Sequence, residues 1–203
     1  MKKLLASLHN RADLAIIVNW IDENARVLDL GCGDGTLLEC ATQHKNIHGM
    51  GVDIDLARIT SCIQKGIPVI QQDLNGSFSN FSTQSFDYVI LSQTVQEIDH
   101  PDRLIDEILR IGKYGIVSFP NFGHWKVRMN LALKGKMPKS RVLPYEWYDT
   151  PNIHMMTIRD FENFCRARGI KILSNYYING EKFSQSKFMP NLFAEGCVAL
   201  ITK

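Results

Sequence analysis

The sequence lacks any long apolar run. No stretch approaches the roughly 18 consecutive apolar residues that mark a transmembrane helix. The opening MKKLLASLHN has two lysines, but Ser7 and His9 interrupt it before it reaches the roughly 7–15 apolar residues of a secretory signal. We therefore expect a cytoplasmic protein with no membrane association.

Cysteine is sparse and has no pattern. No two of the 5 cysteines have C-x-x-C spacing, and their number is odd. This distribution is typical of reduced thiols and disfavours a disulfide framework or a zinc site, so no metal is expected. Cys32 alone has an unusual setting, between two glycines before an expected helix. A helix N-terminus can lower a thiol pKa, but a small side chain also simply fits such a loop.

Excess charge is also lacking. The 203 residues include 23 Lys+Arg and 21 Asp+Glu, and this net charge of +2 argues against a general polyanion partner such as nucleic acid. Hydrophobic residues make up 45% of the chain, enough for a globular core. The length suits a single domain over residues 1–203, with residues 120–156 as an inserted lid or docking segment.

Short apolar segments alternate with helical ones along the first two thirds of the chain. Such an order indicates βαβ units and an α/β fold with a doubly wound, mostly parallel sheet. Near-continuous apolar strands such as FDYVILS fit a sheet covered on both faces. The expected strands are 26–30, 49–53, 68–72, 86–92 and 114–119, and the expected helices are 12–23, 36–44, 56–65 and 101–111.

The last part of the chain changes character. A helix is expected over 157–168, followed by strands over 170–178 and 197–202 with no helix between them, which suggests an antiparallel hairpin at one sheet edge. Ahead of it lies a long connection, residues 120–156, with four prolines and a short helix expected near 125–134. A connection of this length is usually functional or has structure of its own.

The stretch VLDLGCGDG joins an expected strand to an expected helix through Gly31, Gly33 and Gly35. Glycine lets the backbone approach a ligand, and a helix N-terminus offers free N–H groups. The dinucleotide fingerprint would need glycine where Thr36 stands, and a P-loop would need G-K-[ST]. The loop therefore favours neither a dinucleotide-binding dehydrogenase nor a P-loop NTPase.

Aspartates end the strands around this loop. Asp53 stands where a carboxylate can accept both hydroxyls of a ribose. Capping of the next helix is the alternative for Asp53, although Asp55 is better placed for that role. Asp29 lies within a buried strand, where an ionised group needs a cationic partner or N–H donors. We expect Asp29 to contact the amino group of the ligand.

A third aspartate, Asp73, ends the strand that leads into QQDL. Its carboxylate suits the exocyclic amine of an adenine while Leu74 covers the ring. The alternative is a turn-forming aspartate ahead of Asn75-Gly76.

VLDLGCGDG, GVDID, QQDL and FDYVILS, in this order and spacing, resemble the four cofactor motifs of class I S-adenosylmethionine-dependent methyltransferases. The resemblance covers residues 26–120 and implies a Rossmann-like, seven-stranded sheet with a late antiparallel strand. It also implies binding of S-adenosylmethionine or S-adenosylhomocysteine. The residues implied to bind this cofactor are Asp29, Gly31, Cys32, Gly33, Gly35, Asp53, Ile54, Gln72, Asp73, Leu74, Ser92 and Gln93.

A closer resemblance spans residues 11–195. RADLAIIVNWI, IVSFPNFGHWKVR, LPYEWYDTPNIH and NLFAE together resemble the MetW family of methionine biosynthesis proteins. This implies a role beside the homoserine O-acyltransferase MetX, which MetW binds and supports. The family motifs imply no methyl acceptor. We expect an accessory or regulatory function, with an active methyltransferase on a small molecule as the alternative.

No catalytic residue stands out. Neutral oxygen or nitrogen acceptors usually need a base or a polarising group, and an Asn-Pro-Pro-Tyr signature is absent. His124 is the best candidate for a base, although a weak one. The alternative is a histidine held in a hydrogen-bonded loop.

Basic residues gather in the long connection, and Tyr145, Trp147 and Tyr148 follow them directly. Aromatic side chains beside basic ones are favoured interface anchors. We therefore expect residues 120–156 to dock MetX, with a lid over a substrate as the alternative. No nucleic-acid motif is present, and homodimer formation stays open. The basic residues are Lys126, Arg128, Lys134, Lys136, Lys139 and Arg141.

Overall fold

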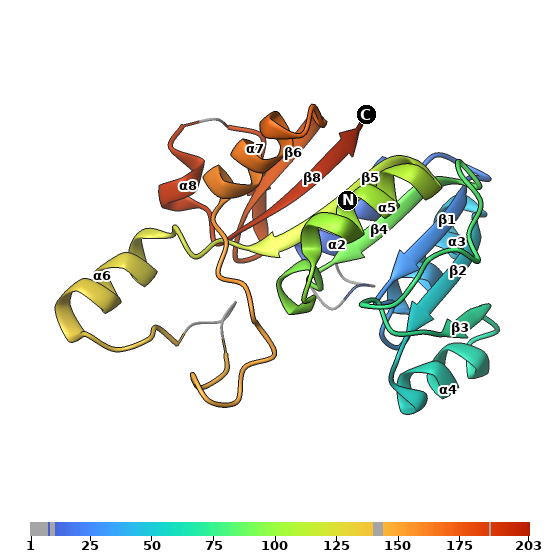
Figure 1. Cartoon of the computed structure of the whole chain (residues 1–203), viewed down its shortest axis with the longest axis horizontal. Coiled ribbons are helices and arrows are strands. Elements are labelled where there is room, and N and C mark those ends of the chain that lie inside the picture. The colour runs from blue at the N-terminus through green and yellow to red at the C-terminus, as the bar shows by residue number, and fades with distance from the viewer. Residues whose placement is uncertain (1–7, 9–10, 140–143, 187) are drawn as a thin grey trace.

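The computed structural model describes residue 8 and residues 11–139, 144–186 and 188–203. Its strands form one sheet in the order β3-β2-β1-β4-β5-β8-β6-β7, with helices on both faces (Figure 1). The strands are β1 Arg26–Leu30, β2 His48–Asp53, β3 Val69–Gln71, β4 Phe86–Ser92, β5 Gly112–Pro120, β6 Lys171–Asn179, β7 Lys182–Ser184 and β8 Gly196–Thr202. The helices are α2 Ala12–Trp20, α3 Thr36–Lys45, α4 Leu56–Gln64, α5 Pro101–Ile111, α6 Trp125–Lys134, α7 Ile158–Ala167 and α8 Pro190–Phe193, with a short 3-10 helix, η1, over Val95–Glu97.

Strands β1 to β5 pair in parallel, whereas β8 runs antiparallel to both β5 and β6. This confirms the expected doubly wound sheet with a late antiparallel strand. The expected hairpin at the sheet edge is wrong in its details, because β8 lies between β5 and β6 and the short helix α8 precedes it.

The sheet has an eighth strand, β7, which the sequence reading missed. It pairs with β6 through a two-residue turn, in which Asn179 faces Lys182 and Gly180 has φ 62°. Glycine is the signal for this hairpin, because a two-residue turn with positive φ at its first position favours glycine there. The sequence YYINGEKFS therefore did contain the information for this strand.

Alternate residues of each central strand enter opposite cores. Leu28 of β1 and Val89 of β4 face the core that α5 and α7 cover. Val27 and Ile90, one position away, face the core that α2 and α3 cover. Because both faces are buried, both sets must be apolar, which explains the near-continuous hydrophobic strands.

Helix α2 departs from the expected amphipathic pattern. Its residues from Ala12 to Val18 are all buried, including Asp13. The helix contacts α3 and also β6 and β8, so it is covered on more than one side. The Asp13 carboxylate tolerates this position because the Arg11 guanidinium binds it at 2.6 and 2.8 Å.

Parallel pairing brings the carboxyl ends of β1, β2 and β4 to one edge of the sheet, where ligands bind in open α/β folds. Helix α6 extends away from the sheet, and the chain returns beneath it towards α7 (Figure 1). The helix expected near 125–134 is thereby confirmed. Within the described ranges, no helix is long and apolar enough to cross a membrane.

Phe119 is the largest of the fully buried side chains, and its ring lies 4.9 Å from that of Phe161 on α7. We expect Phe119→Ala to lower the free energy of unfolding by about 3–5 kcal/mol, because it opens a cavity between β5 and α7. Ile63→Ala is the control, since Ile63 is 64% exposed and should cost less than about 0.5 kcal/mol. Urea denaturation measures both, and similar losses would contradict this account of the core.

Candidate functional site

The three glycines of the loop after β1 all have left-handed backbone, with φ of 75°, 59° and 78° at Gly31, Gly33 and Gly35. They differ in what surrounds them. A Cβ on Gly35 would lie 2.6 Å from Ile67 Cδ1, whereas a Cβ on Gly33 would meet nothing within 4 Å. Gly35 is therefore needed for packing, and Gly33 is the point where the backbone lies open to a ligand.

Asp53 ties this loop to the end of β2. Its Oδ2 accepts a hydrogen bond from the Gly33 N–H at 2.8 Å, and its Oδ1 accepts one from the Asp55 N–H at 3.0 Å. Asp55 in turn caps α4 by accepting from the N–H groups of Ala57 and Arg58. Helix capping therefore belongs to Asp55, as expected. The ribose contact of Asp53 stays a prediction, with the carboxylate already in place at the loop.

Asp73 stabilises a turn, which was the alternative role predicted for it. Its Oδ1 accepts from the Asn75 N–H at 2.9 Å, and its main-chain carbonyl accepts from the Gly76 N–H at 3.0 Å. The carboxylate is exposed, and its second oxygen takes no part in that turn. An adenine contact stays a prediction.

The remaining residues expected around the nucleoside differ in whether their side chains are hydrogen-bonded, packed or exposed. The Gln72 amide binds the Ser77 carbonyl and the Asn80 side chain, each at 3.0 Å, so it holds the following loop. Leu74 packs against the core. Ile54 is 62% exposed beside Asp53, an unusual position for a large apolar side chain that a flat ring could cover.

Asp29 is 2% exposed, and its Oδ1 has no hydrogen-bond partner among the described residues. Burial, together with the nearby charge of Asp53, raises the pKa of this carboxyl to about 7. An unpaired buried carboxylate is costly. A ligand ammonium would remove that cost, so the residue fits the amino group expected there.

The end of β4 is held in a strained conformation. Gln93 has φ 56°, and its N–H donates to the carbonyl and the hydroxyl of Ser118 at 2.9 and 3.1 Å. The Ser118 hydroxyl also lies 3.0 Å from that of Ser92. Positive φ at a non-glycine residue costs free energy and is often found at functional sites.

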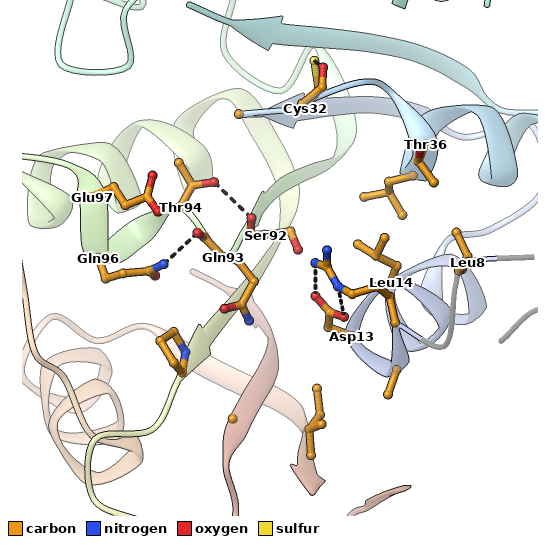
Figure 2. A pocket seen from close by; sticks show the side chains of 18 of the residues that line it. Leu8, Asp13, Leu14, Cys32, Thr36, Ser92, Gln93, Thr94, Gln96 and Glu97 are labelled. Atoms are coloured by element: carbon orange, nitrogen blue, oxygen red, sulfur yellow. Dashed lines mark hydrogen bonds and ion pairs between the residues drawn. The ribbon is translucent and has the colours of Figure 1, made fainter. Parts of the chain in front are cut away.

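A cavity of about 700 Å³ opens at this edge of the sheet (Figure 2). It brings together part of the expected cofactor site, from both the glycine loop and β4. The expected residues that line it are Asp29, Gly31, Cys32, Gly33, Ser92 and Gln93. The described wall does not include Gly35, Asp53, Ile54, Gln72, Asp73 or Leu74. The methionyl half of the expected cofactor site is thus the enclosed one, and the nucleoside half lies outside the cavity.

The sequence reading missed several residues of the cavity wall. No sequence motif indicates that the Arg11–Asp13 ion pair lies in the cavity wall, because the pair comes from the start of α2. The sequence already indicates the polar run from Ser92 to Gln96, after β4, as residues that meet the methionyl end of the cofactor, and Glu97 is the next residue along. The missed polar wall residues are Arg11, Asp13, Asp34, Thr36, Arg58, Glu97, Tyr145, Asn152 and Glu195.

Cys32 lines the cavity as a thiol. Burial raises its pKa, and its Sγ lies 3.9 Å from Cys62 Sγ. A raised pKa keeps the thiolate scarce at neutral pH, which disfavours nucleophilic or redox chemistry. The described cysteines form no disulfide with one another.

His124 does not line the described cavity wall. It is 5% exposed at the start of α6, and burial lowers its pKa. It stays a weak candidate, because a base must reach the proton that it abstracts. Among the described residues, no group of three or more histidine, cysteine or acidic side chains could hold a metal ion.

The long connection contributes both to the cavity wall and to the exposed surface. Its residues Pro144, Tyr145 and Asn152 line the cavity, whereas Trp147 and Tyr148 are 74% and 72% exposed. Of its basic residues, Lys139 is paired with Glu146 at 2.7 Å, and Lys126 lies over the Trp125 ring. Arg141 lies outside the described residues.

We expect Gly33→Ala to weaken binding of S-adenosylhomocysteine by about tenfold or more, because its Cβ occupies the open space over the loop. Gly169→Ala is a matched control. Gly169 has φ 67° and equally open surroundings, but it follows α7. Both variants should lose about 1 kcal/mol of stability from backbone strain. A thermal-shift titration compares them, and equal affinities would contradict an open ligand face at Gly33.

The raised pKa of Asp29 predicts a pH-dependent stability. In the unfolded chain this carboxyl ionises near pH 4, whereas in the folded chain it ionises near pH 7. Stability should therefore fall as pH rises from about 4 to about 7 and then level off. Asp29→Asn cannot ionise, so the variant should gain on the wild type over this range, by at most about 4 kcal/mol. Urea denaturation at several pH values tests this, and a constant difference would refute it.

Comparison with known proteins shows which family the chain matches. The family model described as "Methionine biosynthesis protein MetW" matches residues 11–201. A bifunctional methionine biosynthesis protein MetXA/MetW from Rhodopirellula baltica is 35% identical over 165 residues, which cover 77% of this chain. The match covers 26% of that relative, so the chain corresponds to about a quarter of its length.

Solved structures agree on the fold. A methyltransferase from Mesorhizobium loti superposes with a TM-score of 0.72 at 16% identity, over 97% of this chain and 100% of that one. One from Archaeoglobus fulgidus gives 0.68 at 19% identity, over 97% and 93%. Both are S-adenosylmethionine-dependent methyltransferases, and at these identities they show a shared fold alone. With the class I methyltransferase fold and the family match together, the chain belongs to the MetW family of methionine biosynthesis proteins.

Proposed function

We propose that this protein binds S-adenosylmethionine or S-adenosylhomocysteine and acts as an accessory or regulatory partner of a homoserine O-acyltransferase, MetX. One observation carries the proposal: the long connection lines the cavity with Tyr145 and Asn152 and exposes Trp147 and Tyr148 on the surface. A ligand in the cavity and a partner on the surface would contact the same short segment.

The loop geometry supports cofactor binding. Gly33 leaves the backbone open, and Asp53 holds the loop in that shape through the Gly33 N–H. Asp29 supplies a buried carboxylate oxygen with no described partner, as a ligand ammonium requires. In this assignment, Asp29 and the glycine loop bind the methionyl end, Asp53 binds the ribose, and Asp73 and Leu74 contact the adenine.

The fused relative supports the partnership. Its name joins MetXA and MetW in one chain, and this protein resembles about a quarter of it. Fusion keeps two units at a high effective concentration, which is useful when they act together. A separate MetW chain would need a surface for the same association.

Apolar side chains on α6 and the connection supply such a surface. Leu131 and Leu133 of α6 are 51% and 75% exposed, and Trp147 and Tyr148 lie in the connection that follows. Met137, Tyr145 and Trp147 line one shared hollow, and clustered exposed apolar side chains mark interaction sites more often than scattered ones do. Basic side chains such as Lys126 and Arg128 lie among them, which favours a partner surface with acidic groups.

An active methyltransferase on a small molecule is the second candidate. The cavity of about 700 Å³ favours it, because it extends beyond the glycine loop to Pro120 and Gly196. The position of His124 disfavours it, since the ring does not line the described wall.

The test mixes the purified chain with the acyltransferase and measures complex formation and acylation, with and without S-adenosylhomocysteine. We expect a complex and a change in acylation rate. Trp147→Ala with Tyr148→Ala should weaken the complex about tenfold or more, as loss of aromatic anchors does. Leu173→Ala is the control, since Leu173 is 51% exposed on β6. No complex and no rate change would refute the accessory function, and a methylated product from cell extract that is lost in His124→Ala would support the alternative.

A further inference from the structure

Gln96 carries a second buried oxygen without a partner in the cavity. The residue is 3% exposed, lines the cavity, and its Oε1 has no hydrogen bond within the described chain. Buried amide oxygens are nearly always paired. An unpaired one in the wall of a cavity points to a donor on a bound molecule.

The direction of this oxygen is well determined. Gln96 Nε2 donates to the Gln93 carbonyl at 2.7 Å (Figure 2). Because a carbonyl can only accept, the amide NH2 must face Gln93 and the oxygen must point elsewhere. Ser118 holds Gln93 in its left-handed conformation, so the carbonyl that orients Gln96 is itself held in place.

The main chain of Gln96 is held equally firmly. Its carbonyl accepts from the N–H groups of Ile153 and His154 at 2.8 and 3.0 Å. These two residues belong to the long connection, next to Asn152 of the cavity wall. Gln96 is therefore a rigid acceptor rather than a surface side chain that can turn away.

Gln96 borders the part of the cavity assigned to the methionyl group, since its amide donates to the Gln93 carbonyl, and it lies apart from Cys32 of the glycine loop (Figure 2). In Figure 2, Gln96 and Glu97 lie on one side of Gln93, and Leu14 and Leu8 lie on the other. Because the nucleoside residues are outside the cavity wall, the cofactor needs only part of the 700 Å³. The remainder, next to Gln96, has no assigned occupant.

The chemistry of this remainder favours a cation. Glu97 lines it with a half-buried carboxylate that has no ion pair among the described residues. Arg11, the cation on the opposite wall, is already paired with Asp13. Arg58 also lines the cavity and attracts Glu97 at longer range. Gln96 Oε1 and the Glu97 carboxylate are therefore two neighbouring acceptor groups that have no hydrogen bond or ion pair within the described chain.

We propose that this compartment binds a second small ligand through a primary ammonium group, which donates to Gln96 Oε1 and is balanced by the charge of Glu97. The site lies beside the proposed adenosyl ligand and extends that proposal. An ammonium supplies three donors, and a charged donor makes the stronger hydrogen bond. A ligand with its nitrogen acylated should lose both advantages.

The test titrates the full chain, saturated with S-adenosylhomocysteine, with L-serine, L-homoserine and L-methionine and with their N-acetyl forms. Ligand-observed NMR measures binding. We expect at least one free amino acid to bind in the millimolar range or tighter, and its N-acetyl form to bind about tenfold more weakly or worse. Absence of binding by all three free amino acids, or equal binding of the acetylated forms, would overturn the proposal. If an ordered water alone satisfies Gln96 Oε1, none of the three free amino acids should bind.

Two variants assign the binding to this compartment. Gln96→Met should weaken it about tenfold, and Glu97→Gln should weaken it without disturbing the bond between Gln96 and Gln93. Asn175→Leu is a matched control, because Asn175 Oδ1 is also buried without a described partner but lies on β6, outside the cavity wall. Unchanged binding in both site variants would overturn the assignment, and so would a loss limited to S-adenosylhomocysteine affinity.

The two proposals can fail separately. S-adenosylhomocysteine binding is measured first by thermal shift, and a flat result refutes the cofactor proposal. The titration is then repeated on the ligand-free chain with L-serine, where dependence on Gln96 and Glu97 still decides the ammonium site.

Discussion

Parallel pairing of β1 with both β2 and β4 is the constraint on which the site depends. It places the ends of three strands at one edge, so that the glycine loop, Asp53 and Gln93 come together from distant parts of the chain. One carboxylate then sets the loop. Asp53 accepts from Gly33 and from Asp55, and this joins the loop after β1 to the start of α4. The backbone of the loop is thereby fixed before any ligand arrives.

Several features of the cavity wall lower the local stability of the protein. Asp29 is buried with an unpaired oxygen, Gln96 is buried with another, and Gln93 has positive φ. Each feature costs free energy in a ligand-free protein. They lie at one edge of a sheet whose two cores are otherwise well packed, such as around Phe119. Such costs concentrated at one place are characteristic of a site prepared for a ligand, because binding can recover them.

The long connection extends from this site to the surface. Hydrogen bonds from Ile153 and His154 to the Gln96 carbonyl attach it to the cavity wall, and Tyr145 lines the same cavity. Exposed aromatic side chains stand a few residues away at Trp147 and Tyr148. A segment that contacts both a ligand and a partner can carry a coupling free energy between them. This arrangement is the physical basis for the regulatory function proposed above.

The sequence by itself determined the order of elements and most of the sheet. Alternating apolar strands and helices specify local structure, and loops such as VLDLGCGDG depend on glycine at particular positions, so both can be read without knowing distant contacts. The capping role of Asp55 was likewise local. Strand β7 could also be predicted locally, from Gly180 at the start of the two-residue turn that precedes it.

Only the tertiary structure decided which side chains share a cavity and which already have hydrogen-bond partners. Gln72 is held by Ser77 and Asn80, His124 does not reach the described cavity wall, and β8 inserts between β5 and β6. Gln96 became notable only because Gln93 and the distant residues 153 and 154 hold it with its oxygen unpaired. The physical reason is that hydrogen-bond satisfaction depends on residues far apart in the chain, which no local pattern records.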